Sequence, residues 1–169
     1  MGRLAFILFA IPLLAQPGPQ YAKPDLRLTP GVIDTTIVAD LTKAPHLIGG
    51  VDHNICAPDF RTPPFRVATK NQKIKTAVCA AYGITSGCPG ADWELDDTVA
   101  VEIGGKNVQA NLWPQPIKEA RVKDHQVEDA LGGPKGLVCQ GKITLADAQK
   151  CMRTDWAACA ARVKSLEGK

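Results

Sequence analysis

The sequence predicts one α+β domain, stabilised by disulfide bonds and preceded by an export signal. Residues 93–103 alternate between polar and apolar positions, which is typical of a strand, and other segments repeat apolar residues at helical spacing. The chain has 169 residues and six cysteines. This length suits a single ordinary domain with a leader, and the even number of cysteines suits a disulfide framework in an oxidising compartment.

The composition is that of a globular protein. Charged residues make up 22% of the chain and hydrophobic residues 45%, and the formal net charge is +3. A protein that binds nucleic acid mainly through its charge usually has a denser basic footprint. A nucleic-acid partner is therefore compatible with the sequence but is not demanded by it.

Residues 1–15 are organised like a secretory signal peptide. Arg3 supplies a positive charge, an apolar run extends from Leu4 to Leu14, and Ala15 is a small residue at a plausible cleavage point. The run is shorter than the roughly 20 apolar residues that span a bilayer, so a membrane anchor fits less well. We expect a secreted or periplasmic protein without stable membrane insertion.

The segment 16–52 is expected to be extended and rich in proline and glycine, with at most one short strand. The globular domain is then expected over residues 53–169. Its first helix is predicted at 69–82, where apolar residues share one face and Gly83 provides a C-terminal stop. Residues 93–103 follow as a strand, or as an irregular strand and loop, in which Asp96 and Asp97 point to opposite sides.

Two further helices are expected in the second half of the chain. The first follows Pro114 and ends at Gly132, and its apolar stripe contains one charged residue, Asp124. A carboxylate that faces the interior must be paired, hydrogen-bonded or bound to a metal. The second begins at Thr144 with a capping pattern. Its stripe consists of Leu145, Ala148, Met152, Trp156, Cys159 and Val163.

Helix geometry restricts the cysteine pairs. Cys151 and Cys159 would lie about 12 Å apart along an unbroken helix, whereas the Cα atoms of a disulfide lie within about 7 Å. We therefore expect that these two cysteines do not bond to each other. Zinc ligation is disfavoured, because the sequence has no Cys-x-x-Cys pair.

One stretch carries a recognisable motif. The sequence from Glu94 to Gly105, followed by Asn-Leu-Trp-Pro at 111–114, resembles the core of the HNH (ββα-metal) nuclease superfamily. It is most similar to small secreted bacterial proteins that read Glu-x-Asp-His-x-x-x-x-Glu-x-Gly-Gly. The resemblance covers roughly residues 54–160 and implies a small ββα core with additional flanking helices. The chain departs from it at Asp97, where the family has histidine.

The resemblance implies a role for several residues. In the family the histidine is the general base, and a divalent cation stabilises negative charge on the phosphate. Asp96 would be a metal ligand, Asn111 would orient the base or brace its loop, and a further ligand would come from the helix at Asp124. Lys123 and Glu128 match a substrate-side Lys-Asp-x-x-Glu element, with Glu128 one residue late. The expected cation is Mg²⁺, Mn²⁺ or Ni²⁺.

Asp97 leaves three interpretations open. Its reference pKa of about 3.9, against about 6.5 for histidine, makes it a weaker general base near neutrality. It could instead join Asp96 and Asp124 as a metal ligand, or it could be a solvated residue in a decayed site. His125 is the candidate for a substitute base, paired with Glu128, although a surface histidine with a helix carboxylate is the commoner situation.

The resemblance also implies a disulfide between Cys56 and Cys139. With all six cysteines oxidised, Cys79 and Cys88 are then expected to cross to Cys151 and Cys159, one each. A local pair between Cys79 and Cys88 is the alternative.

Taken together, the sequence predicts an exported HNH-nuclease-like protein that is impaired or rewired at its general base. Residual metal-dependent hydrolysis of phosphodiester bonds is the expected activity. Two alternatives stay open: a non-catalytic module that binds nucleic acid or protein, and a structural envelope protein.

Overall fold

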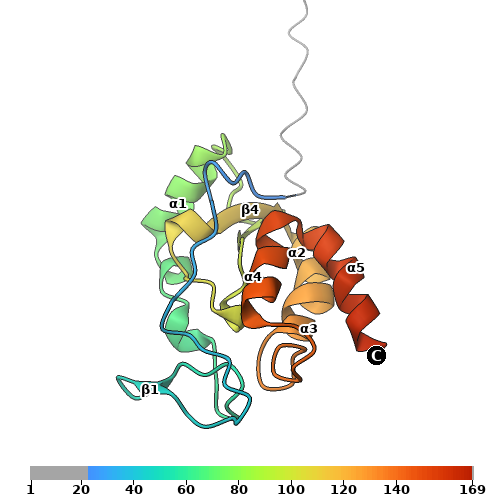
Figure 1. Cartoon of the computed structure of the whole chain (residues 1–169). Coiled ribbons are helices and arrows are strands. Elements are labelled where there is room, and N and C mark those ends of the chain that lie inside the picture. Colours follow the sequence, from blue (N-terminus) through green and yellow to red (C-terminus); the bar gives the residue numbers. More distant parts are fainter. Residues whose placement is uncertain (1–22, 169) are drawn as a thin grey trace, which may run out of the picture.

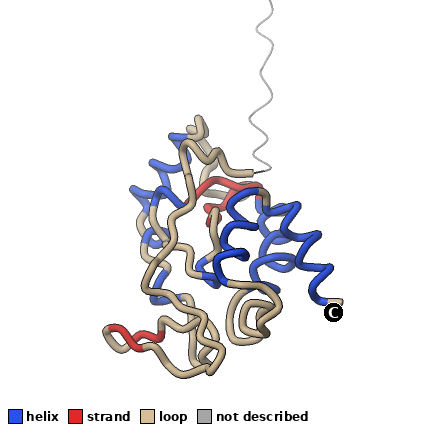
Figure 2. The backbone as a smooth tube through the Cα atoms, in the orientation of Figure 1, coloured by secondary structure: helices blue, strands red, loops and turns tan. Residues whose placement is uncertain are grey.

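The computed structural model describes residues 23–168 and shows a mixed α/β domain with two small antiparallel sheets (Figure 1). Loops make up most of its first third, and helices are more frequent in the second half of the chain (Figure 2). The signal peptide that we predict at 1–15 lies outside the described residues. Within the described part, no helix combines the length and the apolar character needed to cross a membrane.

The larger sheet and the helix that follows it form a ββα unit. Strand β3 (Trp93–Asp97) pairs antiparallel with β4 (Leu112–Pro116), and Asp97 lies opposite Leu112 in the register. Helix α2 (Ile117–Lys123) begins directly after β4. The smaller sheet is a hairpin of β1 (Leu47–Ile48) and β2 (Val51–Asp52) that projects from the domain (Figure 1).

The remaining helices surround this unit. Helix α1 (Gln72–Ala81) packs against β4. Asn71 is its N-cap, and the side chain of Asn71 accepts hydrogen bonds from the backbone N–H groups of Lys73 and Ile74. The chain beyond α2 continues without a break through a π-helical turn (Asp124–Glu128) into α3 (Asp129–Leu131). Helices α4 (Leu145–Thr154) and α5 (Trp156–Glu167) complete the domain. Short 3₁₀ turns lie at Pro63–Phe65, Ala68–Lys70, Val101–Ile103 and Gln109–Asn111.

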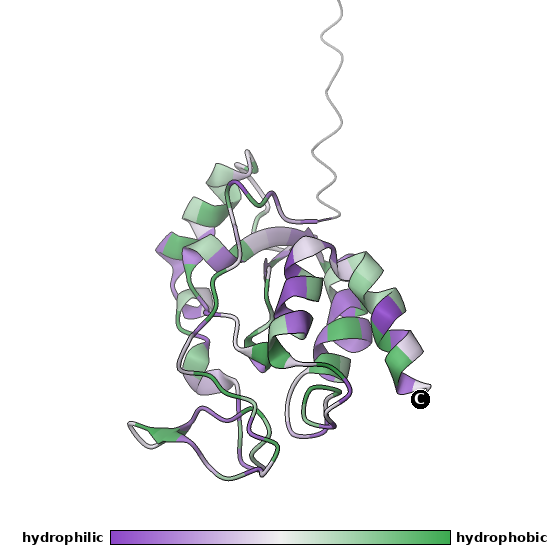
Figure 3. Ribbon diagram, in the orientation of Figure 1, coloured by the Kyte–Doolittle hydropathy of each residue, from purple (hydrophilic) through white to green (hydrophobic). Residues whose placement is uncertain are grey.

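The core has two parts, and Figure 3 shows that apolar residues (green) and polar residues (purple) alternate along the helices. The larger part joins Val99 and Ile103 to Val127 and Leu131 and to the inner faces of α4 and α5. The smaller part packs Trp113 of β4 against α1. The segments that follow β3 and α2 therefore pack in the larger part and β4 packs in the smaller part, which fixes the end of β3 relative to the helices.

The N-terminal segment is not a separate extended tail over the residues that the structure describes. The backbone N–H of Gly31 donates to the carbonyl oxygen of Ala110 at 3.2 Å, and that of Lys106 donates to Val32 at 2.8 Å. Ile37 is buried in the main core. The sequence predicted at most one short strand in this segment, but β1 and β2 both lie in it, so that prediction is wrong. The proline and glycine content also did not reveal that this backbone packs against the domain.

The predicted strand over 93–103 ends at Asp97. Beyond it, Val99, Val101 and Ile103 are buried, but they reach the core from a loop and a 3₁₀ turn. The glycine pair that follows has a steric reason. Gly104 has a left-handed φ of +82°, and a Cβ at Gly105 would lie 1.7 Å from the carbonyl oxygen of Val99.

The predicted last helix is two helices, because the chain breaks at Asp155. This residue has extended backbone angles, and its carboxylate accepts hydrogen bonds from the backbone of Ala157 and Ala158 at 3.1 Å each. Aspartate is a favoured N-cap, so it ends one helix and starts the next. Thr144 caps α4 as predicted.

The break makes one disulfide prediction wrong. It brings the Cα atoms of Cys151 and Cys159 to 5.3 Å, and these two cysteines are bonded. Cys79 pairs locally with Cys88, so the expected crossing to the last helix is wrong as well. The predicted bond between Cys56 and Cys139 is confirmed. Three disulfides fit a protein of an oxidising, extracytoplasmic compartment.

Candidate functional site

An acidic pocket lies where the end of β3 faces the π-helical turn. Its volume is about 440 Å³, and its charged lining consists of six carboxylates, two guanidinium groups and one histidine. These residues are Glu94, Asp96, Glu102, Asp124, Glu128, Asp129, Arg66, Arg121 and His125. Carboxylates therefore outnumber the cationic groups in the lining of this pocket.

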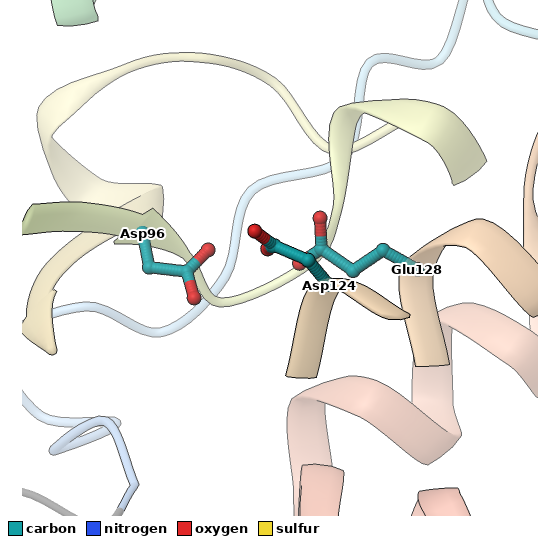
Figure 4. Close-up of side chains that lie close together, drawn as sticks. All are labelled: Asp96, Asp124 and Glu128. Atoms are coloured by element: carbon teal, nitrogen blue, oxygen red, sulfur yellow. The ribbon is translucent and has the colours of Figure 1, made fainter. Parts of the chain in front are cut away.

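Three of the carboxylates converge. One oxygen from each of Asp96, Asp124 and Glu128 lies within 4.8 Å of the others. Figure 4 shows Asp96 reaching in from β3, with Asp124 and Glu128 facing it from the helix. Asp96 and Glu128 are buried and Asp124 is half-buried. Asp97, which we considered as a ligand beside Asp96 and Asp124, is not part of this group, and Glu128 takes its place.

The π-helical turn accounts for the position of Glu128. In a regular α-helix, residues five apart point about 140° away from each other. A π-helix bonds each residue to the fifth one along and so places such a pair on the same side. Lys123 and Glu128 are related in this way, and Lys123 Nζ lies 2.5 Å from Glu128 Oε1. The turn thus absorbs the one extra residue that the sequence motif showed.

Lys123 is the buried counter-ion of the group. Its Nζ also donates to Asp96 Oδ1 at 2.9 Å and to the carbonyl oxygen of Asp97 at 2.8 Å. Burial acts to lower the pKa of Lys123, but the carboxylates of Glu128 and Asp96 outweigh it and raise that pKa, so the ammonium group stays charged. With only 1% of its side chain exposed, Lys123 cannot contact a substrate. That predicted role is therefore wrong for Lys123.

The carboxylates remain crowded in spite of Lys123. Burial first, and then repulsion from Asp96, raises the pKa of Asp124. Burial also raises the pKa of Glu128 well above its ordinary value. Asp96 Oδ2 is buried and has no hydrogen-bond partner among the described residues. The group therefore has more negative charge and more acceptor oxygens than the surrounding residues satisfy.

Asp97 lies behind the pocket and does not line it. Its Oδ1 accepts hydrogen bonds from the side-chain amides of Asn107 at 3.4 Å and Asn111 at 3.3 Å. Its Oδ2 contacts the guanidinium group of Arg66, which does line the pocket, at 3.4 Å. Burial and the neighbouring charge of Asp96 raise the pKa of Asp97 to about 7. The expectation of a solvated Asp97 is therefore wrong, because only 2% of this residue is exposed.

Asn111 connects Asp97 to the loop that follows β3. Besides contacting Asp97, its side chain donates to the carbonyl oxygen of Val99 at 2.9 Å and accepts from the N–H of Val99 at 3.0 Å. This pair of hydrogen bonds ties the start of β4 to the loop after β3. Asn111 therefore braces the loop and holds Asp97 in place.

His125 lies on the rim of the pocket. Its side chain is 76% exposed, and its Nδ1 is 3.3 Å from the carboxylate of Asp129, one helical turn further on. The expected partner, Glu128, points inward to Lys123 instead. His125 therefore lines the acidic pocket, whereas Asp97 does not.

The sequence reasoning missed the ion pairs around Arg66. Its guanidinium group bonds Glu102 Oε1 at 2.7 Å in addition to contacting Asp97. Glu102 lies inside the stretch Glu94 to Gly105 that resembles the nuclease motif, so the motif offered a signal for it. Arg66 comes from a proline-rich loop with no repeating pattern, and only the folded chain brings it to the pocket.

The donor atoms of the converging group are all carboxylate oxygens. Such a set suits Mg²⁺ or Mn²⁺, whereas Ni²⁺ is more often bound by imidazole nitrogen. Comparisons with protein-family models, with curated proteins and with solved structures found no match to this chain.

Proposed function

We propose that this protein is an exported, HNH-nuclease-like protein whose acidic pocket binds Mg²⁺ or Mn²⁺ and hydrolyses phosphodiester bonds weakly. The convergence of Asp96, Asp124 and Glu128 within 4.8 Å carries the proposal. These residues come from the end of the first strand and from the helix of a ββα unit, the elements that supply the ligands in the resembling family. The unpartnered Asp96 Oδ2 adds a free buried acceptor to the same group.

A cation is the physical requirement for a phosphate in this pocket. Six carboxylates against two guanidinium groups would repel a phosphodiester. A divalent ion bound there would offset this repulsion and supply Lewis-acid stabilisation of the phosphate oxygens. Arg66 and Arg121 on the rim are the protein groups that can orient those oxygens.

The weakness of the proposed activity follows from Asp97. A general base must come within hydrogen-bond reach of the water that it deprotonates. The carboxylate of Asp97 is buried among Arg66, Asn107 and Asn111 and does not line the pocket. The position that the family fills with histidine therefore has no base that reaches the pocket.

Binding of Mn²⁺ is expected to stabilise the protein against unfolding. A ligand at 100 times its Kd adds about 2.7 kcal/mol to the free energy of unfolding. Asp124→Asn should lose most of this gain, because it removes one of the three ligands but leaves the buried contacts of Lys123 intact. Thermal unfolding with and without Mn²⁺ measures the effect.

The matched control for this experiment is Asp129→Asn. Asp129 lines the same pocket and carries the same charge, but it lies outside the converging group. Its response to Mn²⁺ should equal that of the wild type. Equal stabilisation of all three proteins would reject the cation site.

Asp97→His is expected to increase plasmid cleavage in the presence of Mg²⁺ or Mn²⁺ on the order of 100-fold or more over the wild type. A positioned general base typically contributes this much, and the longer imidazole ring extends further from β3 than a carboxylate does. Nicking of supercoiled plasmid, followed on gels over time, measures the rate. Asp97→Asn serves as the control for loss of the carboxylate alone and should gain nothing.

The cleavage experiment has two decisive outcomes. If Asp124→Asn, introduced into the Asp97→His protein, leaves the rate unchanged, the cation does not take part and the proposal fails. If wild type and Asp97→His, both shown to be folded by circular dichroism, cut no plasmid with either metal, the proposed hydrolysis is rejected.

A further inference from the structure

A second cavity, of about 520 Å³, lies on the far side of Glu102 from the acidic pocket. Its lining residues are Lys43, Cys56, Pro58, Arg61, Gly132, Gly133, Pro134 and Lys135. All the charged groups among them are cationic. The remaining surface comes from proline rings, glycines and a disulfide-bonded cysteine.

The cations of this cavity are not neutralised by the protein. Within residues 23–168, Lys43, Arg61 and Lys135 form no ion pair, and the guanidinium group of Arg61 bonds two backbone carbonyl oxygens. At the acidic pocket, by contrast, both lining arginines are paired with carboxylates. This second cavity therefore presents three cations that form no ion pair with a carboxylate of the described residues.

The walls of the cavity are held in place. The Cys56–Cys139 disulfide anchors one wall to the main core. On the other side, Gly132 lies so close to Glu102 that a Cβ there would be 2.4 Å from the Cβ of Glu102. Lys43, Arg61 and Lys135 are exposed residues, and they border an open cavity whose walls are fixed by these contacts.

The two cavities are neighbours. Glu102 lines the acidic pocket with its side chain, and its carbonyl oxygen accepts a hydrogen bond from the N–H of Gly133, in the wall of the basic cavity, at 3.4 Å. Arg61 and Arg66 line one cavity each and are five residues apart, so their Cα atoms are separated by no more than about 18 Å. A strand of a few nucleotides can reach from one cavity to the other.

We propose that the basic cavity is a subsite for the phosphodiester backbone of a single nucleic-acid strand, whose neighbouring phosphate reaches the acidic pocket. This inference rests on the proposed function. Grooves for single strands combine cationic groups that follow the backbone with surfaces that bases and sugars can lie on. Lys43, Arg61 and Lys135 supply the charge, while Pro58 and Pro134 supply an apolar surface.

The test is binding of a fluorescent 12-residue oligothymidine, measured by anisotropy in chelator over a range of salt concentrations. The triple variant Lys43→Gln/Arg61→Gln/Lys135→Gln should bind at least tenfold more weakly at low salt. The slope of log affinity against log salt should become shallower by about 2, because each contact between a cation and a single-strand phosphate contributes about 0.7. Lys43→Gln/Lys135→Gln leaves the backbone contacts of Arg61 in place and should lower the slope by about 1.4.

The matched control removes the same number of charges from another surface. Lys70→Gln/Lys73→Gln/Lys75→Gln changes one lysine just before α1 and two in its first half, of which Lys70 and Lys73 are exposed and Lys75 is half-buried, and should bind within twofold of the wild type. An equal loss in this control would show attraction by net charge alone and would overturn the subsite. The subsite would also be overturned if a polyglutamate peptide competed as strongly as the unlabelled oligonucleotide does.

The outcomes for the two proposals can be told apart. Binding in chelator does not depend on a cation, so it can persist when cleavage and Mn²⁺ stabilisation fail, which would reject the proposed hydrolysis alone. Cleavage that survives unchanged in the Lys43→Gln/Lys135→Gln protein would reject the subsite and leave the proposed function standing.

Discussion

Replacing Lys123 by methionine is expected to lower the free energy of unfolding by about 3–5 kcal/mol, which is the usual loss when one partner of a buried ion pair is removed. Methionine fills a similar volume but leaves the carboxylates of Asp96 and Glu128 without their counter-ion. Urea unfolding measures the loss. It should be smaller near pH 5 than at pH 8, because the raised pKa of Glu128 lets this group take up a proton in the folded state as the pH falls.

Two further proteins separate charge from packing in this experiment. Lys118→Met makes the same change at an exposed position of α2 and should alter stability by less than about 0.5 kcal/mol. Adding Asp96→Asn and Glu128→Gln to Lys123→Met neutralises the whole group and should restore most of the loss. If Lys123→Met and Lys118→Met behave alike, the ammonium group is not what holds the acidic side chains together.

Removal of the Cys56–Cys139 disulfide is expected to cause the second large loss. This bond closes a loop with a sequence separation of 83, and loop-closure entropy gives it about 4.5 kcal/mol. The Cys79–Cys88 and Cys151–Cys159 bonds have separations of 9 and 8, for which the same relation gives about 2.5 kcal/mol each. In urea unfolding, the double alanine variant that lacks Cys56–Cys139 should therefore be about 2 kcal/mol less stable than either of the other two double alanine variants, which should be alike.

The comparison among the three disulfides is also its own control. Each variant loses two sulfur atoms and gains two alanines, so the differences report mainly on the loops that are closed. Equal losses for the long and the short loops would mean that local packing, and not chain entropy, determines the contribution of these bonds.

Elements with a local signal in the sequence were predictable. Thr144 and Gly83 marked helix ends correctly, because a cap or a stop depends on a few neighbouring residues. The break at Asp155 was missed, because the apolar stripe continues through it and a single aspartate inside a helix pattern is not unusual. The same error made the cysteine prediction wrong, since the expected distance between the Cα atoms of Cys151 and Cys159 assumed one straight helix.

For the site, the motif indicated which acidic residues lie together better than it indicated the surroundings of each residue. It brought Asp96, Asp124 and Glu128 to attention, and the structure gathers them. It could not show that Lys123 is buried or that Asp97 lies behind Arg66, because both facts depend on contacts between residues at least 26 positions apart. Whether a charged side chain faces solvent or a counter-ion is a property of the packed molecule.

The wide turn at Asp124–Glu128 also has a consequence for how this helix can evolve. Loss of one residue from a uniform α-helix rotates everything beyond it by about 100°, which would take Leu131 away from its neighbours. Here, contraction of the five-residue turn to an ordinary one can absorb such a deletion, because the acidic side chain then follows Lys123 by four positions and still faces it. The helix can therefore differ in length by one residue between descendants of a common ancestor while its acidic side stays in register.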